Sequence, residues 1–553
     1  MSDIRDKFVS AAITRSHGLT DFNIHNDIHK RHEFRKQTIH NDNTLTKFEK
    51  IEAIKWLNKE YDREKILKNS GKKRICENCK EKCLGTLYCE YCIRNHLKSK
   101  FLNWSSGNNN IDNLIQKCQM EILHPQMIIE WIPFNKLQNI KCLTKDGYSD
   151  IYTADWIGGC YKEWDIKIRQ LKRVERPGIQ NLITKVVLKK LENIESANQS
   201  WFDEAKSHLS ISNKHSDIVK CYGLTQDISN RNYMLVMDIR DIDLRKYLQQ
   251  NHNKLNWKQK INITFEIIRA LYVIHKENSI HKNLHSGNIL YSQLNNQWYI
   301  SDLGFSGPAN KPSSCIYGNL PYIAPEVIKE IDYTFKSDIY SIGILMWEIS
   351  SGHPPFINYG HNYNLAINII NGIRPKVTLK IPVEYKNLME QCWDANPLKR
   401  PDLFTLMKKI REMNSYYQGI TDDSVKTEMY DDLKLNKASN SINSKLFTSK
   451  IYQFENLPEP RNATEDEIKV FYSKLHEYNN KDNNKNNKSI SKIFKAKNKK
   501  LTKMLKKLQK KNDVNNDDKN KSNPQTKGSD FDDDDDEVYH SERQDGSDSL
   551  DDI

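Results

Sequence analysis

The sequence lacks any long apolar run. Its longest apolar stretch, Ile339 to Ile349, falls short of the roughly 18 residues that a membrane-spanning helix needs, and Glu348 interrupts it. The N-terminal residues are polar and charged, without the apolar core of a secretory signal, so we expect an intracellular protein, cytoplasmic or nuclear. In that reducing setting the 11 cysteines are expected as thiols or metal ligands and not as disulfides.

Apolar residues are also scarce overall, at 37% against 28% charged residues, which predicts folded domains diluted by polar segments. The net charge of +13 is unevenly spread along the chain. Residues 485–511 carry 12 lysines and no acid, whereas residues 512–553 carry 15 acidic and 4 basic residues. Because the most basic block has its own acidic counterweight, we do not expect nucleic acid as a partner.

Changes in composition divide the chain into seven segments. Only residues 132–415 are dense enough in aromatic and branched apolar residues to bury a large core. The expected segments are a polar, partly helical arm (1–69), a four-cysteine zinc module (70–104), a helical linker (105–131), the large domain (132–415), a linker with one short helix (416–484), a basic amphipathic segment (485–511) and an acidic disordered tail (512–553).

A cysteine cluster lies ahead of the large domain. Two Cys-x2-Cys pairs, whose spacing suits a tetrahedral Zn²⁺ site, are formed by Cys76, Cys79, Cys89 and Cys92. Only nine residues separate the pairs, so we expect a compact, ribbon-like module in which Zn²⁺ has a structural role. Cys83 and His96 are alternative ligands, which leaves the fourth ligand open, and free thiols in a flexible arm are the competing interpretation.

Seven short motifs follow one another through the large domain. They are Val186-Val187-Leu188-Lys189, Trp201-Phe202-Asp203-Glu204, the loop from His281 to Asn288, Asp302-Leu303-Gly304, Ala324-Pro325-Glu326, Asp338 within Ser-Asp-Ile-Tyr-Ser-Ile-Gly, and Arg400 within Asn-Pro-Leu-Lys-Arg-Pro. Each motif is weak alone, but the seven in this order resemble a eukaryotic-type protein kinase. The residue pattern and the loop sequences are most similar to those of the tyrosine-kinase-like branch, and within it to the expanded kinase-like families of mycorrhizal fungi.

The resemblance implies an α+β, bilobal fold with an antiparallel-sheet N-lobe, a helical C-lobe and a nucleotide cleft hinged after Met237-Asp238. It implies ATP and Mg²⁺ as cofactors and protein hydroxyls as substrates. The residues it assigns are Lys189, Glu204, Gly147, Met237 and Asp238 to ATP, Asn288 and Asp302 to Mg²⁺, and His281, Glu326, Asp338 and Arg400 to structural motifs.

The catalytic motifs also depart from the family pattern. Asn283 stands where the family has an aspartate that accepts the proton of the substrate hydroxyl. His285 stands where serine/threonine kinases place a lysine. The stretch 143–152 is the only candidate for the glycine-rich loop, and Gly147 is its single glycine. We therefore expect ATP-Mg²⁺ binding with phosphorylation impaired or absent.

Two classes of function follow from these features. The first is an enzyme of intracellular signalling that phosphorylates protein hydroxyls weakly, and the second is a non-catalytic pseudokinase scaffold or allosteric partner acting through protein contacts. The basic segment 485–511 has apolar residues at helical spacing, which suits a partner helix or an anionic membrane surface. A solvated, lysine-rich tail is the competing interpretation of that segment.

Overall fold

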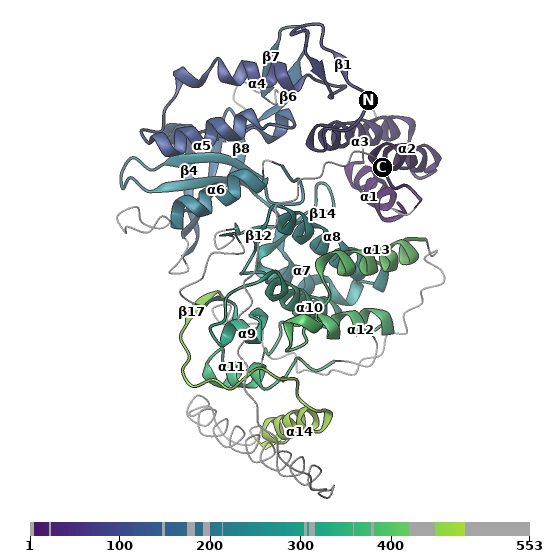
Figure 1. The fold of residues 1–553 in the computed structure, drawn as a ribbon, viewed down its shortest axis with the longest axis vertical. Helices are drawn as coiled ribbons and strands as arrows, with labels where there is room; N and C mark the ends of the chain where they lie inside the picture. The colour runs from purple at the N-terminus through teal and green to yellow at the C-terminus, as the bar shows by residue number, and fades with distance from the viewer. Residues whose placement is uncertain are drawn as a thin grey trace, which may run out of the picture. The chain divides into compact units, whose positions relative to one another are not determined.

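The computed structural model describes residues 5–21, 24–145, 150–173, 183–191, 200–212, 214–303, 307–308, 316–357, 359–377, 381–419 and 448–481 (Figure 1). All of these residues belong to one compact unit, Met1–Asn487. The basic segment 485–511, the acidic tail 512–553 and their expected roles lie outside the described residues, and so does Gly147. None of the helices described has the length and apolar character that a bilayer crossing requires.

The described residues of 5–21 and 24–69 are mainly helical. Three helices, α1 (Asp6–Gly18), α2 (Ile28–Asn41) and α3 (Lys47–Leu67), enclose a small apolar core that includes Ile13, Ile39 and Leu57. Asp27 caps α2, and Thr46 with Glu49 forms a capping box on α3. The segment expected as a polar, partly helical arm thus has helices and also a small apolar core of its own.

The cysteine-rich segment folds as a short hairpin followed by a helix. Its elements are β1 (Arg74–Ile75), β2 (Lys82–Cys83) and α4 (Glu90–Lys98). A second hairpin from the large domain, β6 (Tyr161–Asp165) with β7 (Gln170–Arg173), contacts this segment through Trp164, whose ring meets the His96 ring at 5.6 Å. In the chain this hairpin precedes Lys189.

A six-stranded sheet forms the N-lobe. Its order is β3-β9-β10-β8-β5-β4, antiparallel except where β3 runs parallel to β9. The strands are β3 (Glu130–Trp131), β4 (Leu137–Lys145), β5 (Asp150–Ile157), β8 (Ile183–Lys190), β9 (Cys221–Gln226) and β10 (Tyr233–Asp238). Along β8, Val186 and Leu188 enter one apolar cluster while the alternate residue Val187 packs on the opposite face.

Two helices cover that opposite face of the sheet, α5 (Asn109–Met120) and α6 (Ser200–Ser212). Ile115 of α5 and Leu209 of α6 share one buried cluster with Leu235 of β10. The segment expected as a helical linker is thus built into the N-lobe, because its apolar stripe completes the core beside α6.

The C-lobe is mainly helical. Its helices are α7 (Leu244–Asn251), α8 (Trp257–Lys276), α9 (Pro325–Ile328), α10 (Phe335–Ser351), α11 (Tyr363–Ile370), α12 (Val383–Cys392) and α13 (Leu403–Gly419). Helix α10 is buried on all sides from Ser337 to Ser350. It ends at Gly352, whose φ of 75° suits glycine and whose added Cβ would collide with His252.

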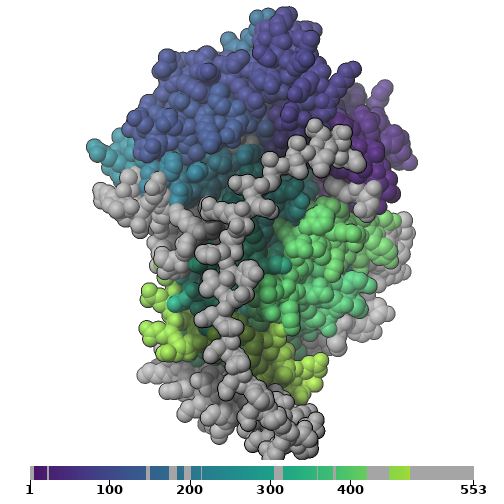
Figure 2. Space-filling model, in the orientation of Figure 1, coloured from purple at the N-terminus to yellow at the C-terminus, as the bar shows by residue number. Residues whose placement is uncertain are grey.

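Short strands border the loops of the C-lobe. They are β11 (Ile242–Asp243), β13 (Ile289–Ser292) and β14 (Gln297–Ile300) in one sheet, β12 (Ser279–Ile280) with β15 (Gly307–Pro308), and β16 (Ile316–Gly318) with β17 (Lys450–Tyr452). Strand β17 and helix α14 (Glu465–Lys481) belong to the segment we expected as a linker. Figure 2 shows the yellow-green atoms of residues 448–481 against the C-lobe at two separate places.

Candidate active site

A buried ion pair joins the sheet of the N-lobe to α6. Lys189 Nζ on β8 lies 2.7 Å from Glu204 Oε1 on α6, and it also pairs with Asp302. Burial opposes the charge of this lysine, but the carboxylates of Asp302 and Glu204 outweigh it and raise the pKa of Lys189. The lysine is therefore a fixed cation in the interior of the site.

Helix α10 holds the backbone of the loop from His281 to Asn288 in place. Asp338, in the first turn of that helix, accepts hydrogen bonds from the backbone N–H groups of His281 (2.8 Å) and Lys282 (3.0 Å). His281 Nε2 lies 3.0 Å from the carbonyl oxygen of Ser301, which ties the loop to the residue before Asp302. The predicted structural residues His281 and Asp338 thus position the neighbouring polar side chains.

Two amide side chains converge on one carboxylate oxygen of Asp302, while Lys189 pairs with the other oxygen. Asn283 Nδ2 donates to Asp302 Oδ2 at 3.3 Å, and Asn288 Nδ2 donates to the same oxygen at 3.2 Å and to the Asn283 carbonyl at 2.9 Å. Burial raises the pKa of Asp302, but the Lys189 ammonium outweighs burial and lowers it. Asp302 is therefore an anion held by one cation and two amides.

Sequence reasoning missed His208. It lies one helical turn after Glu204 on α6, and its Nε2 accepts a hydrogen bond from the backbone N–H of Leu303 at 3.1 Å. Burial lowers the pKa of this imidazole to about 3, so the ring is neutral and fixes the residue after Asp302. The i, i+4 spacing from Glu204 is the signal that would have placed it on the face of α6 that meets Asp302.

His285 is buried and neutral, because burial lowers its pKa to about 3 and the Arg245 cation adds to that effect. Its Nδ1 accepts from the backbone N–H of Gly287 at 3.1 Å, and its Nε2 lies 3.1 Å from Ser449 Oγ. Ser449 also donates to Asn283 Oδ1 at 2.9 Å. This serine, 166 residues away in sequence from Asn283, was not predicted.

The remaining predicted residues lie in the framework. Met237 and Asp238 end β10, where they pair with Val187 and Val186 of β8, next to Lys189. Met237 is buried in the core beneath α6, while the Asp238 carboxylate pairs with Arg240 at 2.5 Å. The hinge and nucleotide contacts assigned to these two residues stay predictions.

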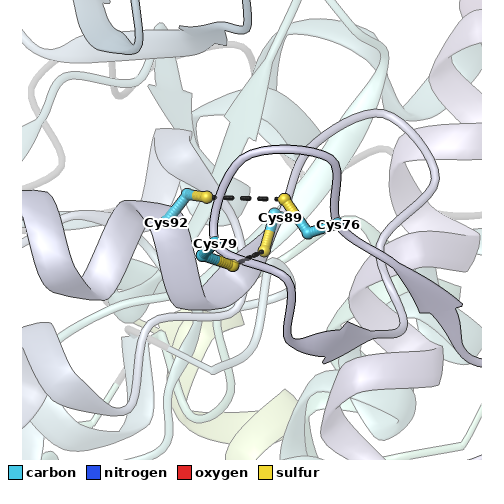
Figure 3. A group of neighbouring side chains, drawn as sticks. All are labelled: Cys76, Cys79, Cys89 and Cys92. Atoms are coloured by element: carbon cyan, nitrogen blue, oxygen red, sulfur yellow. Dashed lines mark hydrogen bonds between the residues drawn. The ribbon is translucent and has the colours of Figure 1, made fainter.

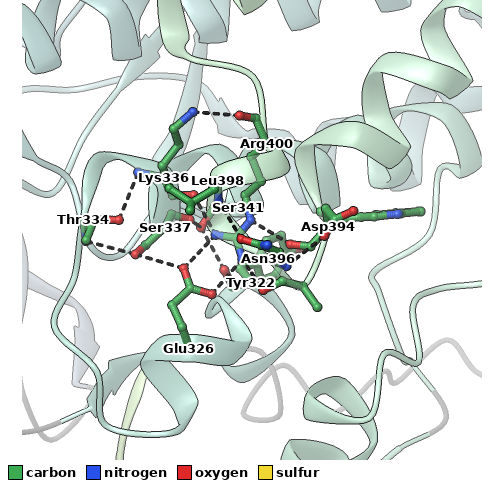
Figure 4. A network of polar contacts seen from close by, with 12 residues as sticks. Tyr322, Glu326, Thr334, Lys336, Ser337, Ser341, Asp394, Asn396, Leu398 and Arg400 are labelled. Atoms are coloured by element: carbon green, nitrogen blue, oxygen red, sulfur yellow. Dashed lines mark hydrogen bonds and ion pairs between the residues drawn. The ribbon is translucent and has the colours of Figure 1, made fainter. Parts of the chain in front are cut away.

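Glu326 and Arg400 form a buried, two-pronged ion pair in the C-lobe. Both Arg400 Nη atoms lie 2.7 Å from the Glu326 oxygens, and Arg400 Nε donates to the Asp394 carbonyl at 2.8 Å (Figure 4). Such two-pronged, charge-assisted hydrogen bonds are among the strong ones in proteins. It joins the first turn of α9 to the loop before α13, 74 residues further along the chain.

The four predicted cysteines meet at one point (Figure 3). The Sγ atoms of Cys76 and Cys92, and those of Cys79 and Cys89, are 3.6 Å apart, and all four lie within 4.8 Å of one another. Cys76 and Cys79 lie in a tight turn that is followed by Lys80, whose φ is 62°. Cys89 and Cys92 lie at the start of α4. His96 contacts Trp164 instead, and Cys83 lies outside this set of four.

Comparisons with known proteins match the same large domain in which the sequence motifs lie. A family model described as protein tyrosine and serine/threonine kinase matches residues 171–410. The chain is 30% identical over 192 residues to the dual specificity protein kinase zakA and 29% identical over 229 residues to the probable serine/threonine-protein kinase qkgA, both of Dictyostelium discoideum. A putative serine/threonine-protein kinase/receptor, R818, of Acanthamoeba polyphaga mimivirus is 32% identical over 164 residues.

These matches cover 32%, 39% and 29% of this chain but only 25%, 14% and 10% of the three relatives. The chain therefore spans a quarter or less of the length of each relative, and the placement in the tyrosine-kinase-like branch stays a prediction. The matched region contains the Lys189–Glu204 pair, the loop at Asn283 and the Glu326–Arg400 pair in the order expected from the sequence. The chain thus contains a protein kinase domain of the eukaryotic type.

Proposed function

We propose that this kinase domain binds Mg²⁺-ATP between its lobes and that its transfer of phosphate to protein hydroxyls is impaired. The observation that carries the proposal is an assembled set of charges around an amide at the position of the catalytic base. Lys189 pairs with Glu204, as a working kinase site requires, and also with Asp302, while Asn283 faces the Ser449 hydroxyl with its amide oxygen.

The side chains present fit the two cofactors. Lys189 offers a buried cation for a phosphate, and the oxygens of Asp302 and Asn288 are the hard ligands that Mg²⁺ prefers. ATP would supply the phosphoryl group, and Mg²⁺ would neutralise the charge on its phosphates. His208 holds the backbone next to Asp302, and Glu204 holds Lys189 in place.

Asn283 accounts for the impairment. Its amide oxygen can accept a hydrogen bond from a hydroxyl, but an amide does not take up a proton near neutral pH. A general base contributes about 10²–10⁴ in rate, whereas the remaining catalysis by kinases comes from positioning and charge neutralisation. A slow residual transfer is the expected property of this site.

Nucleotide binding and transfer are to be measured separately on the full chain. Mg²⁺-ATP should raise the thermal unfolding temperature of the wild type, and Lys189→Met and Asp302→Asn should reduce that rise. The exposed Lys185→Met is the matched control, because that side chain is three-quarters exposed on the same strand. If Mg²⁺-ATP produces no stabilisation and no calorimetric binding in the wild type, the proposed nucleotide site is refuted.

The alternative function is a pseudokinase scaffold or allosteric partner in signalling. Its support is the extent of additional structure packed on the domain, since α5 completes the N-lobe core and residues 448–481 contact the C-lobe. Transfer from labelled ATP separates the two functions. Activity above the Lys189→Met level supports a slow kinase, whereas a wild type and an Asn283→Asp variant that are both silent support the scaffold.

We also propose a structural Zn²⁺ held by Cys76, Cys79, Cys89 and Cys92. Four sulfurs about 2.3 Å from one zinc lie about 3.8 Å apart in a regular tetrahedron, close to the two separations of 3.6 Å. With four thiolates no position is left for a catalytic water. Metal analysis of the purified chain should give one zinc per chain, Cys79→Ser should lose it, and exposed Cys142→Ser should keep it. Zinc-free wild type would refute the site.

A further inference from the structure

We propose that residues 448–457 are a tethered ligand of the acceptor-peptide site of the kinase domain, with Ser449 in the place of the acceptor hydroxyl. The site would accept an extended peptide with a hydroxyl residue followed, three positions later, by an aromatic residue. This inference rests on the proposed function only in taking residue 283 as the position that meets the acceptor.

The hydroxyl of Ser449 is held by the two loop residues that depart from the family pattern. Since His285 Nδ1 accepts from the Gly287 N–H, a neutral His285 carries its proton on Nε2 and donates it to Ser449 Oγ at 3.1 Å. Ser449 Oγ then donates to Asn283 Oδ1 at 2.9 Å. The amide of Asn283 is oriented by its own donation to Asp302, so each of these groups has one consistent role.

The backbone beyond Ser449 adds a strand to the segment that ends at Ala324-Pro325-Glu326. Strand β17 pairs antiparallel with β16, with Gly318 opposite Lys450 and Ile316 opposite Tyr452. Gly318 has a φ of 150°, and a Cβ on it would meet Asn283 Oδ1 at 3.4 Å. Strand addition of this kind gives affinity through the main chain and selectivity through alternate side chains.

The side chains of the segment explain the selectivity. Tyr452 is 8% exposed and stacks on Phe454 at 5.6 Å, whereas the preceding residue, Ile451, is 42% exposed. The aromatic residue at the third position after Ser449 is therefore the one that the C-lobe covers. The Lys450 side chain is exposed.

The chain that follows this segment is anchored elsewhere on the C-lobe. Backbone N–H of Arg461 donates to the Ile370 carbonyl at 3.0 Å, and Asn462 Oδ1 accepts from Ala395 N–H at 2.9 Å. Helix α14 then buries Phe471, whose ring stacks on Tyr359 at 5.7 Å (Figure 1 shows α14 below α11). Because only a short stretch of chain separates Ser449 from the anchor at Arg461, the ligand is held at an effective concentration on the order of millimolar.

The first test is binding in trans, measured on the full chain. A labelled synthetic peptide of residues 448–457 should bind the Ser449→Ala/Tyr452→Ala variant about tenfold or more tightly than the wild type, whose site is filled. Tyr416→Ala is the matched control, since Tyr416 is exposed on α13, and it should bind like the wild type. Equal affinity for the wild type and the double variant would overturn the proposal.

The second test is hydrogen exchange, which requires no variant. The amides of Lys450–Tyr452 should be protected in the wild type, and in the double variant exchange should rise there and at Ile316–Gly318 together. Rapid exchange at Lys450–Tyr452 in the wild type would refute the proposal. Neither readout involves nucleotide, so failure of Mg²⁺-ATP to bind would refute the proposed function and leave this result standing.

Discussion

The contact between Asn283 and Asp302 is specific to an amide, and this allows a sharp prediction for Asn283→Asp. In the wild type Asn283 Nδ2 donates to Asp302 Oδ2 at 3.3 Å. The variant replaces that donor with a second carboxylate oxygen at the same place. It therefore removes a hydrogen bond to a charged group and adds a repulsion between like charges.

The magnitude follows from the distance. A hydrogen bond to a charged group contributes about 1.5–3 kcal/mol, and two like charges about 4 Å apart repel by about 4 kcal/mol at an effective dielectric constant of 20. Lys189 lies beside Asp302 and neutralises part of the new charge. We therefore expect the nucleotide-free variant to lose about 2–4 kcal/mol of unfolding free energy, and Mg²⁺ with a non-hydrolysable ATP analogue to restore most of it.

Chemical denaturation with and without Mg²⁺ and the analogue measures both parts. The double variant Asn283→Asp/Asp302→Asn is the matched control, because it keeps one carboxylate and one amide and should recover nucleotide-free stability. A single variant as stable as the wild type, within about 0.5 kcal/mol, would refute the contact between Asn283 and Asp302.

Three further predictions concern the framework. Arg400→Met leaves Glu326 buried without its partner and should lower the unfolding free energy by about 3–5 kcal/mol, measured by chemical denaturation. Arg400→Met/Glu326→Leu should recover much of this loss, and equal losses in the two variants would contradict the pairing. Ile115→Ala on α5 should cost about 2–5 kcal/mol because Ile115 is fully buried in the N-lobe, whereas a loss near zero would restore the linker interpretation. Burial lowers the pKa of His124 to about 3. Below about pH 6.5 the unfolded chain therefore binds a proton that the folded chain does not, and the unfolding free energy falls as the pH drops. His124→Asn should reduce that fall by about 1.4 kcal/mol per pH unit, and an unchanged slope between pH 7.5 and 5 would contradict the burial of His124 as a neutral ring.

The charged core of the active site could be predicted from the sequence because each member lies in a short local motif. Lys189 follows three apolar residues of one strand, and Asp302 and Asn288 lie in loops whose neighbours fix the backbone. The structure brings these residues together as the resemblance implies. Their roles toward ATP and Mg²⁺ stay predictions until binding is measured.

The surroundings of the site could not be predicted, since they depend on contacts between distant segments. Ser449 reaches Asn283 only because β17 pairs with β16, and a serine in a polar stretch carries no local signal. Residues 5–69 looked too polar for a core because α2 buries Arg31, His32 and Arg35 beside few apolar side chains. Hydrophobic patterning does not anticipate cores that include charged residues.

The most direct test of the account is transfer of labelled phosphate from Mg²⁺-ATP by the full chain, followed by mapping of the labelled residue. We expect the wild type to transfer at least about 100-fold more slowly than Asn283→Asp, because only the variant has a carboxylate to accept the hydroxyl proton. In that variant a bond forms between Ser449 Oγ and the γ-phosphorus as the bond to ADP breaks, so label should appear at Ser449 at a rate independent of protein concentration. A wild type as fast as Asn283→Asp, with Lys189→Met silent, would contradict the claim that Asn283 limits this kinase domain.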